Sequence, residues 1–193
     1  MTVVINTSQI SEREFRDIGN IEYSPTIKYG SPEFVIKNSS DQVRSIIQEM
    51  LPNINNKHNN VIIDVKVHDL KLGEMPCMNN WHMDCVGRHD EEFKEECHHL
   101  IIFGDCSRTI FLCDSITLEN VPNDKVINWN KVIDLHPYNI FQIKPNHIYT
   151  YGRNLHRGAP ATKDGRRLLI RITETDKIKP QNIKRDIYTR ITD

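Results

Sequence analysis

The sequence predicts a mainly β fold of the α+β class, an antiparallel sandwich or barrel accompanied by one or two helices. β-branched residues dominate its apolar set, with 26 Ile and 11 Val against 2 Ala, and this balance favours strands over helices. Short apolar runs are separated by Gly, Pro, Asn and Asp with few helical patterns between them, which is typical of antiparallel sheets. A chain of 193 residues is long enough to form one domain that folds without disulfides or a metal.

The N-terminal part, residues 1–58, is expected to cover the sheet. Short apolar groups near the N-terminus are broken by Gly and Pro and predict covering strands or irregular structure. A helix is expected after Ser39 or Ser40, because either residue can cap it, and it should end before Pro52. The buried face of this helix is expected at helical spacing and comprises Val43, Ile46, Ile47 and Met50.

A long half-buried strand is expected within residues 59–73, where apolar and polar residues alternate. Its two faces are formed by Val61, Ile63, Val65 and Val67, and by Asp64, Lys66 and His68. Further strand-like runs occupy residues 98–105, 108–118, 132–145, 146–152 and 166–175. The acidic stretch at residues 87–99 is expected to form a helical turn or a lid loop.

Charge and hydropathy exclude several classes of protein. The 25 Lys and Arg residues balance 26 Asp and Glu residues, for a formal net charge of -1, which argues against a nucleic-acid partner. The apolar runs are far shorter than the ~20 residues that a membrane-spanning helix needs, so no membrane association is expected. The N-terminus has no basic start followed by an apolar stretch, so no secretory signal is predicted and a cytoplasmic location is expected.

The cysteines are odd in number and lack paired short spacings, which predicts reduced thiols rather than a disulfide framework. They are Cys77, Cys85, Cys97, Cys106 and Cys113. A zinc site built from Cys97, His98 and His99 with Cys85 or Cys106 matches no standard zinc-ligand spacing. A hydrolase that uses Cys85 as its nucleophile has no local signature. Both have less support in the sequence than a metal site at His82, Asp84 and His156.

Three residues form a stronger metal-ligand pattern. His82 and Asp84 are two positions apart in the sequence, so in an extended strand their side chains point to the same face. His156 follows a strand-like run much later in the chain. Two neutral imidazoles and one carboxylate on one face of a metal form the facial triad of non-haem Fe(II) oxygenases, which leaves coordination positions open. We therefore predict that these residues bind a metal ion.

Two arginines lie on the strand-like run that follows His156. Arg167 and Arg171 share one face of that run, and buried charges cost several kcal/mol unless they are paired. Arginine is suited to bidentate contact with a carboxylate. A 2-oxo acid can fill two of the open metal positions and O₂ the third, so an arginine is expected to pair with the distant carboxylate of such a co-substrate.

His-x-Asp, a distal His and an Arg on the next strand, in this order, resemble the Fe(II)/2-oxoglutarate-dependent dioxygenase superfamily. The similarity covers about residues 60–175. It implies a double-stranded β-helix, that is, a jelly-roll or cupin-like barrel, within a single domain of residues 1–193 that ends in a tail at residues 176–193. It also implies a hydroxylase that uses Fe(II), 2-oxoglutarate and O₂ and releases succinate and CO₂.

The resemblance implies a role for each matching residue. His82, Asp84 and His156 would hold the iron and form the catalytic centre, and the presence of Asp84 implies hydroxylation rather than halogenation. Arg171, in preference to Arg167, would pair with the distant carboxylate of 2-oxoglutarate. Hydroxyl contacts near the co-substrate are expected from Tyr149, Tyr151 and Thr109.

The substrate is expected to be a polar small molecule of the amino-acid or natural-product type. Arg88, Arg153 and Arg157 flank the two ligand segments and favour an anionic or zwitterionic substrate, provided that they face the cavity. Trp81 directly precedes His82 and is also expected to bind substrate. A peptide, a protein or a nucleotide is the alternative substrate for the same chemistry. The rival from another class is a non-catalytic metal-binding β-barrel module, and no feature indicates a particular oligomeric state.

Overall fold

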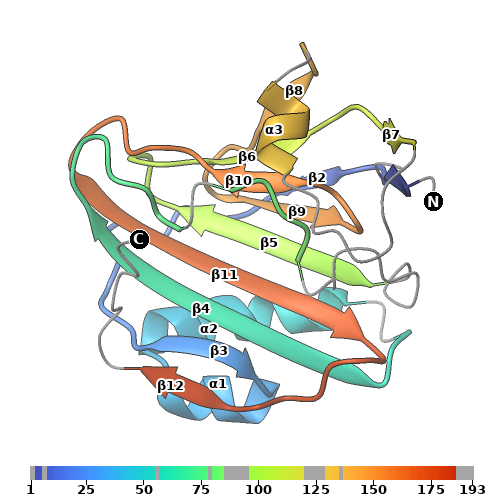
Figure 1. The fold of residues 1–193 in the computed structure, drawn as a ribbon. Coiled ribbons are helices and arrows are strands. Elements are labelled where there is room, and N and C mark those ends of the chain that lie inside the picture. The colour runs from blue at the N-terminus through green and yellow to red at the C-terminus, as the bar shows by residue number, and fades with distance from the viewer. Residues whose placement is uncertain are drawn as a thin grey trace.

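The computed structural model describes residues 3–5, 8–54, 57–77, 80–84, 96–119, 129–134 and 137–185. Within these residues the protein is mainly β, and neighbouring strands pair antiparallel (Figure 1). The predicted class, a β-rich fold with few helices, is therefore confirmed. No helix in this part of the chain is long and apolar enough to cross a membrane.

A seven-stranded sheet runs through the centre of the molecule, with the strand order β12-β3-β4-β11-β5-β9-β2. Its strands are β2 (Ser11–Glu14), β3 (Thr26–Gly30), β4 (Asn60–Leu70), β5 (Cys97–Phe103), β9 (His147–Tyr151), β11 (Gly165–Thr175) and β12 (Ile183–Arg185). The two longest strands, β4 and β11, pair over their whole length, from Gly165 opposite Leu70 to Thr175 opposite Asn60. This pairing brings the polar face of β4 beside the arginines of β11.

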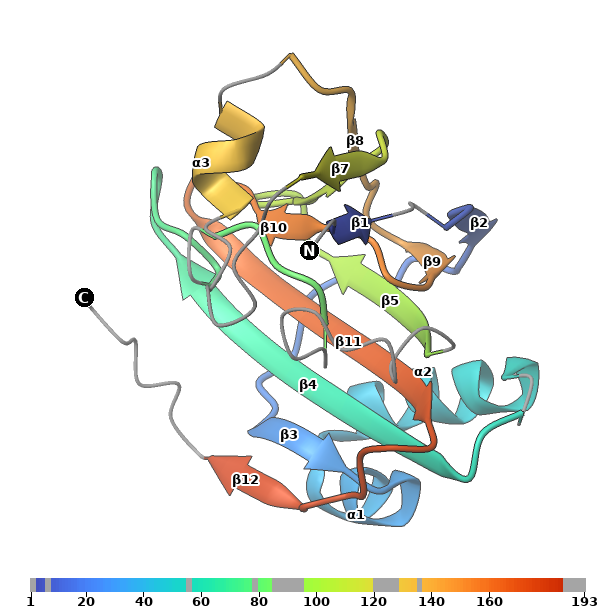
Figure 2. The same cartoon turned by 45° about the vertical axis from the view of Figure 1, so that its right-hand side comes forward.

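A smaller three-stranded sheet lies over one end of the large sheet (Figures 1 and 2). Its strands are β6 (Thr109–Leu112), β8 (Ile140–Gln142) and β10 (His156–Gly158), while β1 (Val3–Ile5) and β7 (Ile116–Leu118) form a separate pair. Leu100 and Ile102 of β5 share an apolar cluster with Phe111 of β6. The two sheets therefore pack against each other through side chains from their facing surfaces.

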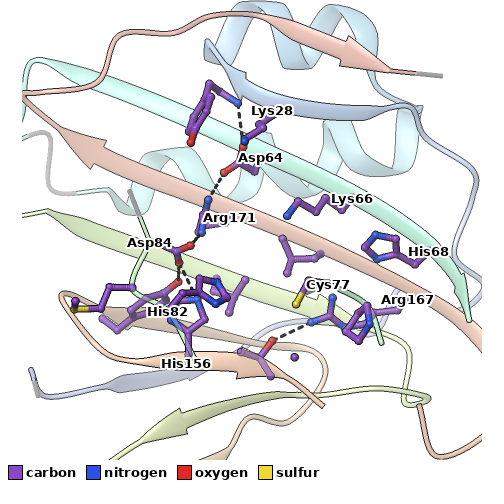
Figure 3. A pocket seen from close by; sticks show the side chains of 18 residues that line it. Lys28, Asp64, Lys66, His68, Cys77, His82, Asp84, His156, Arg167 and Arg171 are labelled. Carbon is purple, nitrogen blue, oxygen red and sulfur yellow. Dashed lines mark hydrogen bonds and ion pairs between the residues drawn. The ribbon is translucent and has the colours of Figure 1, made fainter. Parts of the chain in front are cut away.

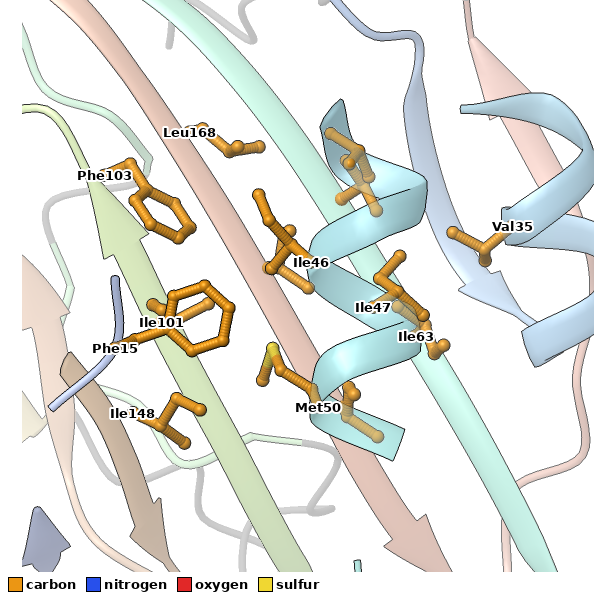
Figure 4. Packing of buried hydrophobic residues seen from close by; sticks show 14 of the residues in the cluster. Phe15, Val35, Ile46, Ile47, Met50, Ile63, Ile101, Phe103, Ile148 and Leu168 are labelled. Atoms are coloured by element: carbon orange, nitrogen blue, oxygen red, sulfur yellow. The ribbon is translucent and has the colours of Figure 1, made fainter. Parts of the chain in front are cut away.

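The opposite face of the large sheet is covered by α1 (Pro32–Asn38) and α2 (Asp41–Met50), which is followed by the 3₁₀ helix η1 (Leu51–Asn53). The predicted cap of α2 is confirmed, because the Ser40 hydroxyl accepts a hydrogen bond from the Val43 N–H at 3.3 Å. Its predicted apolar face is buried against the sheet (Figure 4). The helix α1 was not predicted, although Ser31 caps it and Pro32 occupies its first turn, which is a common start signal for a helix.

One predicted strand was partly wrong. Residues 132–145 were expected to form a single strand, but the structure has α3 (Trp129–Asp134) followed by β8. Trp129 and Ile133 are one helical turn apart and both are buried in the cluster that contains Trp81 and Leu112, so burial of these side chains at helical spacing prevails over the strand propensity of Val132 and Ile133.

Two other expectations concern segments that are described only in part. Of the acidic stretch at residues 87–99, the last three residues belong to β5, and residues 87–95 lie outside the described residues. Of the C-terminal tail, Ile183–Arg185 forms β12 at the edge of the large sheet beside β3. Residues 186–193 lie outside the described part of the chain.

Candidate metal centre

His82 and His156 lie directly opposite each other in an antiparallel bridge. The His82 N–H donates to the His156 carbonyl at 3.0 Å, and the His156 N–H donates to the His82 carbonyl at 2.9 Å. β10 begins at His156 and is fixed in turn by β6, where His156 pairs with Phe111. The backbone alone therefore sets the two imidazole rings side by side, with their centroids 4.5 Å apart.

Asp84 completes a compact group with the two histidines (Figure 3). One side-chain donor atom from each of His82, Asp84 and His156 lies within 4.8 Å of the other two. The His156 Nε2 atom is 3.1 Å from Asp84 Oδ2. The structure thus brings together the three residues that the sequence predicts as metal ligands.

Both imidazoles are oriented by a hydrogen bond at Nδ1. His82 Nδ1 lies 2.8 Å from the Asn80 carbonyl oxygen, and His156 Nδ1 lies 3.0 Å from the Asn154 carbonyl oxygen. A carbonyl oxygen can only accept, so each Nδ1 carries the hydrogen and each neutral ring keeps its lone pair on Nε2. This arrangement of a ligating nitrogen backed by a carbonyl is common among metal-binding histidines.

The electrostatics of this group favour a bound cation. Burial lowers the pKa of His82 to about 3, with a further contribution from His156, and burial lowers the pKa of His156 to about 4. Both rings are therefore neutral at pH 7. The lone pair of His156 Nε2 then faces a carboxylate oxygen of Asp84, and a cation between them would turn this repulsion into two favourable contacts.

Asp84 is held by two further groups. The Tyr151 hydroxyl donates a hydrogen bond to Asp84 Oδ2 at 2.6 Å, and the Arg171 guanidinium forms an ion pair with Asp84 Oδ1. Arg171 also forms an ion pair with Asp64 on β4, whose other oxygen accepts the Tyr29 N–H at 2.9 Å. Burial raises the pKa of Asp64, but the charge of Arg171 and the hydrogen bonds outweigh this effect and the pKa is lowered.

A cavity of about 240 Å³ opens beside the three predicted ligands. One of its walls is the inner face of β4 and β11, where Asp64 lies opposite Arg171, Lys66 opposite Leu169 and His68 opposite Arg167. Lys28 of β3 and Cys77 also line it (Figure 3). The wall therefore carries more cationic groups than carboxylates.

Arg167 is the most deeply buried of these cations, with 2% of its surface exposed. Its guanidinium donates to the Thr109 hydroxyl at 2.9 Å, whereas its Nε has no hydrogen-bond partner and no carboxylate pairs with it among the described residues. Burial lowers the pKa of Arg167 to about 10, so the group remains charged at neutral pH. An unpaired buried guanidinium of this kind is a site for an anion.

Lys66 is the second cation in the wall for which the described residues provide no ion pair or hydrogen bond. Burial lowers its pKa, and the nearby charge of Arg171 lowers it further. Lys66 lies between the Arg171 and Arg167 positions along the inner face (Figure 3). The cavity therefore has two unpaired positive groups on one wall.

Of the other predicted site residues, some line the cavity and others do not. Thr109 lines the cavity beside Arg167, whereas Tyr149 does not line it, and its hydroxyl accepts a hydrogen bond from the Lys144 N–H at 3.0 Å. Trp81, Arg153 and Arg157 do not line the cavity either. Trp81 belongs to a buried apolar cluster, and Arg157 stacks over its ring at 4.8 Å.

Arg88 lies outside the described residues. Since neither Arg153 nor Arg157 faces the cavity, the flanking arginines give no support for an anionic substrate. The residues of β4 that line the cavity were not predicted as site residues. The alternation within residues 59–73 identified a polar face that contains these residues, but it did not indicate that this face lies beside Arg167 and Arg171.

Comparisons of the chain with protein-family models, with curated proteins and with solved structures gave no match in any of the three.

Proposed function

We propose that this protein is an Fe(II)- and 2-oxoglutarate-dependent oxygenase that hydroxylates a polar small molecule and converts 2-oxoglutarate to succinate and CO₂. The proposal includes the corresponding fold, in which the large and small sheets form the two halves of a double-stranded β-helix. It extends the family resemblance of the sequence with the geometry of the site.

The observation that carries this proposal is the orientation of His82 and His156. Both rings keep an unprotonated Nε2, the Nε2 of His156 lies 3.1 Å from Asp84 Oδ2, and a buried unpaired guanidinium, Arg167, lines the same cavity. Two imidazoles and one carboxylate suit Fe(II) and leave other coordination positions open. The bound metal would supply the O₂ chemistry, while the chain orients the ligands through Asn80 and Asn154.

The ion pairs in the cavity favour Arg167 over Arg171 as the residue that pairs with the distant carboxylate of 2-oxoglutarate. Arg171 is already shared between Asp64 and Asp84, so the order implied by the resemblance is reversed in this proposal. Arg167 would bind the carboxylate with the atoms that face away from Thr109. Arg171 would keep Asp84 oriented toward the metal.

The second unpaired cation, Lys66, favours a substrate that carries an anionic group, as an amino acid does. After 2-oxoglutarate has neutralised Arg167, the charge of Lys66 would remain for the substrate, with Lys28 at the exposed side of the cavity. The cavity volume of about 240 Å³ is below the 300–1,000 Å³ typical of ligand pockets. A small molecule or one side chain of a peptide therefore fits better than a nucleotide.

A non-catalytic metal-binding module is the second candidate, and one observation favours it. The arginine that the resemblance implies for 2-oxoglutarate, Arg171, is instead paired with Asp64 and Asp84, as expected for a metal site that binds no co-substrate. Such a site could bind a metal without supporting turnover.

Succinate formation separates the two candidates. The purified chain would be incubated with Fe(II), ascorbate, O₂ and isotopically labelled 2-oxoglutarate, first without substrate and then with panels of amino acids and short peptides. An oxygenase releases labelled succinate and CO₂ in equal amounts, and both His82→Ala and Arg167→Met abolish this release. Metal binding without succinate, either alone or with every compound in the panels, would contradict the proposal and favour the module.

A further inference from the structure

A second group of possible metal ligands lies on the other face of the large sheet. Cys97 of β5 and Glu174 of β11 are directly opposite each other in the strand register, and His99 is two positions further along β5. These residues share the face of Ile101 and Phe103, which pack toward α2. His98 points to the opposite face, where its ring lies 5.1 Å from that of Tyr151. The sheet therefore separates this group from the candidate iron centre.

The distances within the group suit a metal ion. One donor atom from each of Cys97, His99 and Glu174 lies within 4.8 Å of the other two. Cys97 Sγ is 3.6 Å from His99 Nε2. Tetrahedral zinc with ordinary Zn–S and Zn–N bonds places a sulfur and a nitrogen ligand about 3.6 Å apart. His99 Nε2 is 2.9 Å from Glu174 Oε1, so only a small movement of the carboxylate would be needed.

Two of the three residues, His99 and Glu174, are each held by a neighbouring group through the atom that would not bind the metal. His99 Nδ1 is 2.9 Å from the Thr150 hydroxyl on the adjacent strand β9, which can accept the Nδ1 hydrogen and leave Nε2 for the metal. Glu174 Oε2 accepts the Lys57 N–H at 3.3 Å. Cys97 carries a free thiol. The group therefore has the fixed outer contacts that a ligand set requires.

We propose that Cys97, His99 and Glu174 bind a zinc ion that joins the ends of β5 and β11. Thiolate, imidazole and carboxylate together favour zinc over calcium or magnesium, which prefer oxygen ligands alone. A water molecule would complete the tetrahedral coordination as the fourth ligand. In the absence of zinc, the His99 Nε2 hydrogen would instead be donated to Glu174, with the thiol as a neighbour.

Cobalt(II) serves as the spectroscopic probe for this site. The full chain, stripped of metal under reducing conditions, would be titrated with Co(II) in a His82→Ala background, which removes one ligand of the other centre. Coordination by Cys97 produces a near-ultraviolet thiolate-to-cobalt band with one equivalent bound, and zinc displaces the cobalt. Cys97→Ser should abolish the band and reduce zinc affinity at least a hundredfold.

Matched variants keep the test specific. Cys77→Ser and Cys113→Ser change thiols elsewhere and should leave the band intact, whereas His99→Gln and Glu174→Gln should weaken zinc binding while far-ultraviolet circular dichroism is unchanged. The proposal is overturned if Co(II) gives no thiolate band, or if the band persists in Cys97→Ser. Because the titration does not depend on 2-oxoglutarate or on His82, its outcome is independent of the proposed oxygenase activity.

Discussion

Arg171 forms an ion pair with Asp84 and, at the same time, with Asp64 on the neighbouring strand. Arg167 lies on the same face of β11 but has no carboxylate partner among the described residues. Two arginines that look equivalent in the sequence therefore have different surroundings. In the proposed oxygenase, Arg171 positions a metal ligand and Arg167 binds the co-substrate.

Substitution of each arginine by lysine tests this division of roles. Arg167→Lys keeps the positive charge but loses the planar pair of donors, so the KM for 2-oxoglutarate should rise about 10- to 100-fold, as expected when about 1.5–3 kcal/mol of charge-assisted hydrogen bonding is lost. Arg171→Lys should change this KM by less and should mainly lower Fe(II) affinity. Titration of 2-oxoglutarate and of Fe(II) in both variants provides the measurement. A larger effect on the KM in Arg171→Lys would mean that Arg171, as the resemblance implies, pairs with the co-substrate.

Replacement of the histidines should remove the metal without unfolding the chain. His82→Ala deletes a half-buried ring, while His156 is buried beside Phe111 and Tyr151, so His156→Gln avoids a large cavity in that cluster. Both variants should lose Fe(II) binding and keep their far-ultraviolet circular dichroism. Metal analysis after desalting checks this, and Fe(II) content equal to that of the wild type in either variant would rule out the ligand assignment.

The hydroxyl of Tyr151 should increase the metal affinity of the site, because it holds Asp84. Tyr151→Phe removes the 2.6 Å hydrogen bond but retains the buried ring, so the apolar packing should be preserved. Loss of such an outer contact typically costs 10- to 100-fold in metal affinity. Competition with a chelator of known affinity measures the change, with Tyr149→Phe as the control because Tyr149 does not line the cavity. Equal affinities in all three proteins would show that Tyr151 does not orient Asp84.

Lys66 should be unfavourable for folding and favourable for ligand binding. Burial lowers its pKa, which reflects the cost of holding the charge without a partner. Lys66→Met should therefore stabilise the ligand-free protein by about 1 kcal/mol, or about 2–4 °C in Tm for a chain of this size, while turnover of an anionic substrate declines. Thermal melting gives the first result and steady-state kinetics the second. A lower Tm in Lys66→Met would mean that the lysine stabilises the fold.

Much of the fold follows from local patterns in the sequence. The alternation within residues 59–73 predicted the strand β4, the strand-like run at residues 166–175 predicted β11, and the possible cap at Ser39 or Ser40 predicted α2. The His-x-Asp spacing indicated a shared direction for His82 and Asp84. These features depend on residues that are close in the chain, so periodicity and spacing are sufficient to detect them.

The features of the fold and of the site that were not predicted depend on contacts between residues that are far apart in the sequence. The strand pairing that sets Asp64 opposite Arg171 cannot be obtained from either strand alone, so the polar face of β4 was not recognised as the wall of a cavity. The same applies to Glu174, which lies opposite Cys97 only because β11 pairs with β5. Trp81 and Arg157 were assigned to the substrate because of their neighbours in sequence, whereas their packing directs them elsewhere.

The cross-strand ion pair between Asp64 and Arg171 also bears on how the sheet avoids an incorrect alignment. Side chains alternate between the two faces of a strand, so a slip of β11 by one residue would turn Arg167 and Arg171 toward the apolar layer beneath α2. The cost of burying these charges there would strongly disfavour the slipped sheet. Residues that serve the cavity therefore also ensure that the two longest strands have a single permitted alignment, and replacing several of these charges by apolar residues at once should yield a mixture of misaligned conformers.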